Sequence, residues 1–252
     1  MPLTSTHNPL LQDIRRASRE GRPTEDGLIA IEGPHLIEEA LASPWRIERV
    51  FVTGESRSRY GGLLTQAGVE PTEVGARAFA SMAGTETSQG ILALVRPKRW
   101  RSAELFHEPA LVVVLDGIQD PGNAGAMVRS AEAFGATGVG IANGGVHLAN
   151  GKFLRAAAGS LFRIPFSERI DVEELRRVRI FALVAQSARR IQEANLRVPC
   201  ALVVGNEAAG LSRDLLKMAE PISIPTQRVE SLNAAVACSI ALFEAQRQRS
   251  AR

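Results

Sequence analysis

Short, continuously apolar runs recur along the second half of the chain, and they restrict its fold more than any other feature. A strand that is apolar at every residue is typical of a parallel sheet covered by helices on both faces. A strand with one solvent-exposed face instead alternates apolar and polar residues. Helix-forming segments separate the runs, as in a chain of βαβ units. We therefore predict an α/β domain built on a parallel sheet. The predicted strands lie at residues 110–115, 138–142, 161–166, 180–186, 200–205 and 221–225.

The first part of the chain shows a similar alternation on a smaller scale. An amphipathic helix, with Leu11 and Ile14 on one face and Arg15 and Arg16 on the other, comes before four short predicted strands. A chain of 252 residues is long enough for two domains, each with its own core. We predict an α/β domain over residues 1–98, a linker over 99–108 and the larger domain over 109–252.

The composition argues against several other classes of protein. Apolar residues make up 45% and charged residues 23%, as in a soluble globular protein, and no apolar run approaches the roughly 20 residues that span a bilayer. Cys200 and Cys238 stand in apolar surroundings, which predicts reduced core thiols and a cytoplasmic protein. None of the four histidines has metal-ligand spacing, so no metal site is predicted.

Arginine dominates the basic residues, although the net charge is only +3. Of the 30 basic residues only Lys98, Lys152 and Lys217 are lysine, which leaves 27 arginines. The planar guanidinium suits bidentate contact with phosphate and stacking on bases. An arginine excess also arises from a GC-rich genome, so the charge permits a nucleic-acid partner without requiring one.

Three polar segments follow predicted strands of the larger domain, at residues 120–131, 204–212 and 224–235. Ligands of open α/β sheets bind beyond the carboxyl ends of the strands, so three such segments predict a pocket there. In the first segment, Asp120 followed by Pro121 predicts an N-cap and the first turn of a helix. Asn123 and Arg129 are then about 9 Å apart along that helix and would border one cleft. An ordinary strand–turn–helix joint explains this segment equally well.

Known nucleotide motifs do not account for these segments. The chain has neither a G-x-G-x-x-G fingerprint nor a Walker sequence with its lysine, which argues against dinucleotide and nucleoside triphosphate binding. A nucleotide-dependent oxidoreductase is disfavoured for the same reason.

Together the three segments resemble the signature motifs of the SpoU/TrmH family of RNA ribose 2′-O-methyltransferases, in the SPOUT superfamily. The first is similar to N-P-x-N-x-G-x-x-x-R-[ST]-A, with Asp120 where asparagine is usual; the second is similar to G-x-E-x-x-G. The third is similar to I-P-x-x-x-x-x-S-L-N-V-x-x-A, with Ala234 in place of the common valine. Each motif alone is a weak signal, but three in this order are specific.

The resemblance implies a parallel sheet closed by a C-terminal trefoil knot, which periodicity would not predict because knots are rare. It also implies that the pocket binds S-adenosylmethionine. The catalytic residues implied are Asn123, Arg129, Ser231 and Asn233, and the cofactor-binding residues are Gly205, Asn206, Glu207, Gly210, Ile224, Pro225, Leu232 and Asn233.

Roles for the polar residues follow from the chemistry of methyl transfer to a hydroxyl. In the family the arginine matching Arg129 is proposed to activate the 2′-hydroxyl. Because arginine normally stays protonated, we favour a role in binding the adjacent phosphate and stabilising the developing alkoxide. Asn123 would orient the hydroxyl or Arg129. Glu207 would hold Asn123 or organise a dimer-related cleft, or it is a carboxylate favoured at a helix N-terminus.

The resemblance extends to the rest of the chain and to its partners. Residues 27–41 and 86–97 look like the ribosomal-protein-like RNA-binding domain of many members, and residues 152–165 are similar to a segment of rRNA-directed members, with Ala157 where serine is common. RNA, most of all rRNA, is the expected substrate. The expected RNA contacts are Arg15, Arg16 and Arg155.

A homodimer is also implied by the resemblance. The predicted helix 231–249 carries Leu232, Val236, Ile240 and Phe243 at helical spacing, and this row would pack either on a second copy or within its own domain.

Two other functions remain open for this fold. One is a tRNA ribose methyltransferase, although tRNA-directed members often have short terminal extensions in place of an N-terminal domain. The other is a non-catalytic RNA-binding or ribosome-assembly protein. Loss of Asn123, Arg129 or Ser231 would favour the latter, and all three are present.

Overall fold

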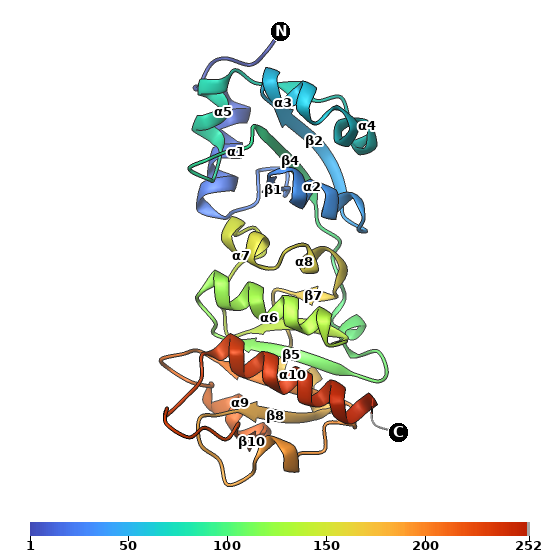
Figure 1. Cartoon of the computed structure of the whole chain (residues 1–252), viewed down its shortest axis with the longest axis vertical. Coiled ribbons are helices and arrows are strands. Elements are labelled where there is room, and N and C mark those ends of the chain that lie inside the picture. The colour runs from blue at the N-terminus through green and yellow to red at the C-terminus, as the bar shows by residue number, and fades with distance from the viewer. Residues whose placement is uncertain (251–252) are drawn as a thin grey trace. The chain divides into compact units, whose positions relative to one another are not determined.

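The computed structural model describes residues 1–250, and these form two compact units. The first contains Met1–Lys98 together with His147–Arg163, and the second contains Arg99–Val146 and the described chain from Ile164 onward (Figure 1). The structure differs from the predicted domains at two places. Residues 99–108 are not a free linker, because they contain the 3-10 helix η1 (Ser102–Phe106), whose Leu105 is fully buried in the second unit. Residues 147–163 interrupt the predicted second domain and belong to the first unit.

The first unit is a four-stranded sheet of order β1-β4-β2-β3. Strand β4 runs antiparallel to both of its neighbours, and β2 and β3 are parallel. Its strands are β1 (Ile29–Glu32), β2 (Arg46–Val52), β3 (Thr72–Glu73) and β4 (Ile91–Arg96), and its N-terminal helices are α1 (Pro9–Glu20), α2 (Pro34–Leu41), α3 (Gly54–Arg59), α4 (Gly61–Ala67) and α5 (Ala76–Met82). Leu11 and Ile14 of α1 pack with Phe79 of α5 against Phe51 and Leu92 of the sheet. The predicted apolar face of the first helix is therefore confirmed.

The segment 147–163 completes the first unit with α7 (Gly151–Ala156) and α8 (Ser160–Arg163). The ring of Phe162 meets Trp45 edge to face, with 4.6 Å between ring centroids, and Arg163 forms an ion pair with Glu39. The predicted strand over 161–166 is wrong, because its first three residues lie on α8 and only Phe166–Ser167 form a strand, β7. A short buried apolar run fits a helical turn as well as a strand, so periodicity does not distinguish them.

The second unit is a six-stranded sheet of order β10-β8-β9-β5-β6-β7 in which all neighbouring strands are parallel. Every residue of β5 is buried, which explains why its first five residues are all apolar. The predicted parallel-sheet α/β fold is confirmed. The strands not yet bounded are β5 (Leu111–Asp116), β6 (Gly138–Ala142), β8 (Arg179–Leu183), β9 (Cys200–Gly205) and β10 (Glu220–Ile222).

Helices cover this sheet in two layers. On one side, α6 (Pro121–Ala133) and α10 (Ala234–Ser250) pack against each other. On the other side, Leu105 of η1, Leu175 of η2 (Val172–Arg177) and Leu215 of α9 (Arg213–Met218) form one core with Val112 and Val114. A further 3-10 helix, η3 (Ile191–Glu193), follows β8.

The last turn of α10 is fixed to the amino ends of the central strands. The Arg249 guanidinium donates to the carbonyl oxygens of Pro109, Ala110, Leu196 and Val198 at 2.8–2.9 Å. Cys238 on the same helix is fully buried, and burial raises the pKa of its thiol to about 12. This cysteine is therefore a packing residue and not a nucleophile.

Neither a membrane span nor a metal cluster is present in the described chain. No helix within residues 1–250 combines the length and the apolar character needed to cross a bilayer. Over the same residues, no group of three or more His, Cys, Asp or Glu side chains is placed to hold a metal ion.

Candidate active site

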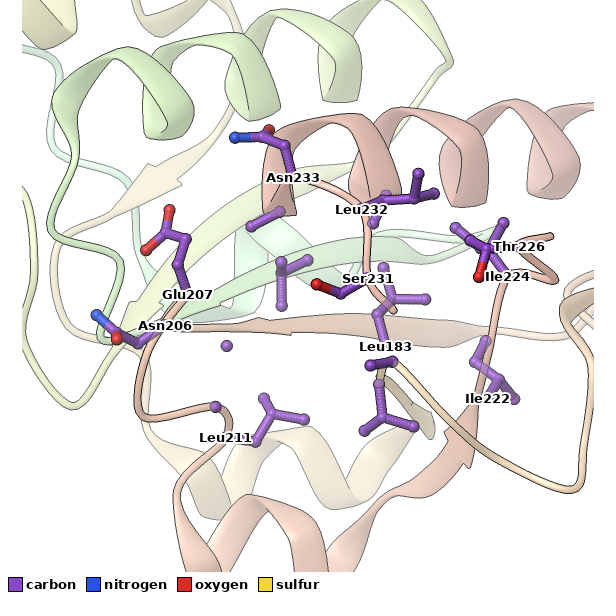
Figure 2. A pocket seen from close by; sticks show the side chains of 17 residues that line it. Leu183, Asn206, Glu207, Leu211, Ile222, Ile224, Thr226, Ser231, Leu232 and Asn233 are labelled. Carbon is purple, nitrogen blue, oxygen red and sulfur yellow. The ribbon is translucent and has the colours of Figure 1, made fainter. Parts of the chain in front are cut away.

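A cavity of about 450 Å³ opens at the carboxyl ends of β8, β9 and β10 (Figure 2). Its volume lies within the range of roughly 300–1,000 Å³ that is usual for small-molecule sites. The wall comes from the end of β8, from the second of the three polar segments and from the third. The lining residues used below are Leu183, Gly205, Asn206, Glu207, Gly210, Leu211, Ile222, Ile224, Ser231, Leu232 and Asn233.

The second segment is a closed loop that Asn206 shapes from inside. The Asn206 side-chain oxygen accepts hydrogen bonds from the backbone nitrogens of Ala208 and Ala209, both at 2.9 Å. Asn206 and Gly210 also exchange two backbone hydrogen bonds, and Gly210 takes a left-handed conformation with φ of 69°. Asn206 thus lines the cavity, and its side-chain oxygen accepts the hydrogen bonds that the backbone N–H groups of the loop donate.

Gly205 is required by the close approach of this loop. A Cβ atom at position 205 would lie 2.6 Å from the carbonyl carbon and oxygen of Gly210 and 2.7 Å from the nitrogen of Leu211. These are backbone atoms, so the contact cannot be relieved by rotating a side chain. The glycine therefore lets the loop fold directly over the end of β9.

Three side chains from the three polar segments form one hydrogen-bonded chain. The Asn123 Nδ2 donates to Glu207 Oε1 at 2.6 Å, and the Asn233 Nδ2 donates to Asn123 Oδ1 at 3.1 Å. The Asn233 Oδ1 accepts from the backbone nitrogens of Ala235 and Val236 at the start of α10, which fixes the orientation of its amide. The predicted contact between Glu207 and Asn123 is present in the structure.

The first segment begins α6 as its sequence predicts. The Asp120 carboxylate accepts from the Asn123 backbone nitrogen at 2.7 Å, and Pro121 is the first helical residue. Asn123 therefore lies in the first turn, where it reaches Glu207. Arg129 lies further along α6, exposed, with no hydrogen bond or ion pair to any residue of the described chain and outside the cavity wall.

Ser231 and Leu232 line the cavity, and the Ser231 hydroxyl is directed toward the side on which Glu207 lies (Figure 2). Pro225 does not line it. It belongs to an adjacent polar hollow that also contains Arg228 and Glu230 and shares Ile224 and Thr226 with the main cavity.

Sequence reasoning missed the wall formed by Leu183, Val184 and Ala185. These residues end β8, which lies between β9 and β10 in the sheet. An apolar strand end was visible in the sequence, but strand order was not, and only that order places β8 beside the pocket.

The three arginines predicted to contact RNA all lie in the first unit. Arg15 on α1 and Arg155 on α7 are exposed, and neither side chain has a hydrogen bond or ion pair to another described residue. Arg16 is paired with Asp13 at 3.5 Å and with Glu25 at 3.0 Å. The end of α1 meets the start of α7, because Gly21 lies against Asn150. Helices that are 130 positions apart in the sequence are thus neighbours in one unit.

Comparison with known proteins gives consistent similarities for both units. The model of the SpoU rRNA methylase family matches residues 110–243, and the model of an MRM3-like substrate binding domain matches residues 8–93. The 23S rRNA (guanosine(2553)-2′-O)-methyltransferase RlmP of Bacillus subtilis is 32% identical over 248 residues, which cover 96% of this chain and 97% of that protein.

Two solved structures are similar over nearly the whole chain. The AdoMet-bound rRNA methyltransferase of Sinorhizobium meliloti superposes with a TM-score of 0.82 at 28% identity, covering 98% of this chain and 97% of that one. The SpoU methyltransferase AviRb of Streptomyces viridochromogenes, in complex with AdoMet, gives a TM-score of 0.84 at 25% identity, covering 98% and 100%.

Proposed function

The chain belongs to the SpoU rRNA methylase family, and from that premise we propose that its second unit transfers a methyl group from S-adenosylmethionine to a ribose 2′-hydroxyl of rRNA. The resemblance to this family and the predicted fold class are confirmed. The observation that carries the proposal is the cavity lined by the second and third motifs, to which Asn123 of the first motif is joined by hydrogen bonds with Glu207 and Asn233.

The residues of the cavity fit S-adenosylmethionine, which supplies a methyl group activated by the positive charge of its sulfonium. Leu183, Ile222 and Leu232 give an apolar wall for the adenine ring, and the volume is that of a small-molecule site. Gly210 has no other atom within 4 Å of the place a Cβ would take, so its backbone is open to the ligand. We assign the adenosine to these residues and to Ile224, with Pro225 supporting the loop from behind.

The polar residues of the cavity act on the amino-acid end of the cofactor and on the hydroxyl. Ser231 and Asn233 border the methionine part, on the side of the cavity nearest Asn123. Asn123 orients the attacking 2′-hydroxyl, and Glu207 fixes the direction of the Asn123 amide by accepting from its Nδ2. Holding two reactants in line contributes a large part of the rate enhancement of such displacements.

Arg129 binds the phosphate next to the target ribose and stabilises the hydroxyl as it loses its proton. Its exposure and its lack of partners among the described residues leave all five N–H donors available to RNA. A bidentate contact uses the planar fork of arginine, which lysine lacks. Arg129→Lys should therefore lower turnover about 10-fold or more while the affinity for S-adenosylmethionine is unchanged. Near-normal turnover with unchanged RNA affinity would contradict the role of the fork.

The first unit binds the RNA substrate through exposed arginines. Arg15 and Arg155 are available for phosphate contact, whereas Asp13 and Glu25 offset part of the charge of Arg16. The match of residues 8–93 to a substrate-binding domain supports this division of labour.

The second unit pairs with a second copy of itself through α10. Val236, Ile240 and Phe243 form an apolar row that is 48%, 36% and 53% exposed, and Phe134 of α6 meets Phe243 at 5.9 Å between ring centroids. Leu232, predicted to belong to the same row, lines the cavity instead. A second copy would cover the row and bring two cavities near one interface. Light scattering should give a dimer, and Phe243→Asp a monomer.

Two measurements test the activity. Calorimetry should show binding of S-adenosylmethionine and no binding of NAD. Mapping of ribose methylation in RNA from cells with and without the gene should show that one 2′-O-methyl group of rRNA disappears with the gene. Binding of neither ligand would favour the non-catalytic RNA-binding alternative, and disappearance of a tRNA methylation would favour the tRNA alternative.

A further inference from the structure

A buried carboxylate ends the central strand of the second sheet and plays no part in the chemistry described above. Asp116 is 2% exposed and is the last residue of β5, in register with Ala142 of β6 and Gly205 of β9. Alternation along a strand puts its side chain on the same face as Val112 and Val114, which belong to the apolar core. A carboxylate in such a place is costly to bury unless it is hydrogen-bonded.

The carboxylate joins the segments that follow three adjacent strands. The backbone nitrogen of Ser212 donates to Asp116 Oδ2 at 2.6 Å, and the Asn143 Nδ2 donates to Asp116 Oδ1 at 2.8 Å. The same Asn143 nitrogen also contacts the Ser212 hydroxyl oxygen at 3.0 Å. Asn143 takes a left-handed conformation with φ of 54°, which is unusual for a residue other than glycine.

These bonds hold the far end of the loop that carries Glu207. The near end is held as well, because the Asn206 Nδ2 donates to the carbonyl oxygen of Gly117 at 2.9 Å. Consecutive residues of the β5 terminus, Asp116 and Gly117, thus fix both ends of the loop 206–212. Between these two anchors lie Glu207, which reaches Asn123, and Leu211, which lines the cavity.

We propose that Asp116 is a positioning residue for methyl transfer: by accepting the Ser212 N–H it holds the loop 206–212 over the cofactor cavity and sets the reach of Glu207 to Asn123. The proposal rests on the proposed function for its effect on catalysis. Among the described residues, no cationic side chain is bonded to the Asp116 carboxylate, so it acts through hydrogen bonds and not through an ion pair. The oxygen that matters is Oδ2, which accepts from the Ser212 N–H.

Two substitutions at Asp116 separate the hydrogen bond from the charge. Asp116→Ala removes the acceptor of Ser212 N–H, and we expect the Kd for S-adenosylmethionine to rise about 10-fold, with a comparable fall in kcat. Asp116→Asn keeps an oxygen for Ser212, and its new amide can donate to Asn143 once the Asn143 amide rotates. It should restore the Kd to within about threefold of the wild type.

A second pair of variants alters the donor and leaves Asp116 in place. Ser212 has φ of −60°, which proline adopts, so Ser212→Pro deletes the N–H without forcing that angle. Ser212→Ala keeps the N–H and removes only the hydroxyl. We expect Ser212→Pro to reproduce the impairment seen with Asp116→Ala and Ser212→Ala to be impaired much less.

Amide hydrogen exchange of a peptide covering residues 206–214 reports on the loop without any cofactor. Exchange should rise in Asp116→Ala and Ser212→Pro and stay close to wild type in Asp116→Asn. Val112→Ala, on the same face of the same strand but near its other end, is the matched control for general loss of core packing. It should lower Tm without changing exchange of this peptide or the Kd.

Several results would overturn the proposal. They are a wild-type Kd and unchanged loop exchange in Asp116→Ala, equal impairment in Val112→Ala, or an Asp116→Asn variant as impaired as Asp116→Ala. If the wild-type chain does not bind S-adenosylmethionine, the proposed function fails, while the exchange measurement still decides whether Asp116 holds the loop.

Discussion

The cavity of the second unit and the arginines of the first unit use side chains in opposite ways. In the cavity, Asn123, Glu207 and Asn233 are bonded to one another, and the backbone of the loop folds tightly over Gly205. On the first unit, Arg15 and Arg155 are exposed and bonded to nothing else in the described chain. A site of the first kind should fail abruptly when one atom is added or removed, because its parts depend on one another. A surface of the second kind should weaken in small, additive steps.

The largest effect is expected where the cavity is tightest, at Gly205. Gly205→Ala puts a methyl group 2.6 Å from backbone atoms of Gly210, so the loop must move away from β9. Overpacking of this kind costs about 1–3 kcal/mol, which predicts a fall of about 5- to 150-fold in affinity for S-adenosylmethionine. Isothermal calorimetry on the full chain measures it directly.

Gly62→Ala is the matched control, because a Cβ at Gly62 meets no atom within 4 Å. Gly62 lies in α4 of the first unit, so this change should leave cofactor affinity unchanged and stabilise the helix slightly. Unchanged affinity in Gly205→Ala would mean that the loop is loose, and the contrast between the two regions would be wrong.

A smaller effect is expected from the polar chain, at Glu207. Glu207→Ala leaves the Asn123 Nδ2 without its acceptor, so the amide that we propose to orient the hydroxyl is free to turn. We expect kcat to fall about 10-fold, since one charge-assisted hydrogen bond is worth roughly 1.5–3 kcal/mol when buried and less at an exposed rim. Single-turnover measurements with saturating cofactor separate this from binding.

Glu207→Gln keeps an oxygen for Asn123 and is the control for the hydrogen bond. Its kcat should lie within about threefold of the wild type. If the glutamine variant is as slow as the alanine variant, Glu207 acts through its charge and not by fixing Asn123.

The sequence predicted the tight site better than the exposed surface, for a physical reason. Asn233 bonds to the backbone at the start of α10, Asn123 bonds to Glu207 and Asn233, and Gly205 has no room for a side chain. Few other residues meet these demands, so the three positions belong to motifs that can be recognised. Arginines that contact phosphate act at longer range and from many positions, and they leave no comparable pattern. The trefoil knot, inferred only from the resemblance, stays a prediction.

The predictions that failed depend on contacts between residues far apart in the chain. The predicted linker 99–108 contributes Leu105 to the core of the second unit, and the segment 147–163 joins the first. The wall formed by Leu183 depends on strand order. None of these follows from a local pattern, because local periodicity reports which face of an element is buried and not which element covers it.

The exposed surface should respond in smaller steps. Arg15→Ala and Arg155→Ala should each weaken RNA binding about 3- to 5-fold. Each should also reduce the dependence of log K on log salt concentration by about one unit, because each removes the cation that neutralises one phosphate. The Kd for S-adenosylmethionine should not change. Binding is measured by titration of an rRNA fragment at several salt concentrations.

Arg57→Ala provides the comparison for this surface, since Arg57 is also exposed but is paired with Glu70 at 3.0 Å. It should weaken RNA binding less than Arg155→Ala. Equal weakening in all three variants would show a diffuse electrostatic effect of the whole unit, without specific contacts from α1 and α7.

The smallest effect is expected from the backbone, at Ala158 between α7 and α8. Ala158 has φ of 46°, which is a left-handed backbone conformation. In the loop over the cavity the residue with this conformation is a glycine, Gly210. Ala158→Gly removes the clash of Cβ with the backbone, partly offset by the greater freedom of glycine in the unfolded chain, so we expect stabilisation of about 0.5–1 kcal/mol. For a chain of this length that is a rise in Tm of roughly 1–4 °C, which calorimetry measures. The affinity for S-adenosylmethionine should not change.

The neighbouring Gly159 has φ of 87° and lies against Glu39, so Gly159→Ala should shift Tm in the opposite direction. A lower stability in Ala158→Gly would mean that the alanine methyl group contributes packing that outweighs the backbone strain.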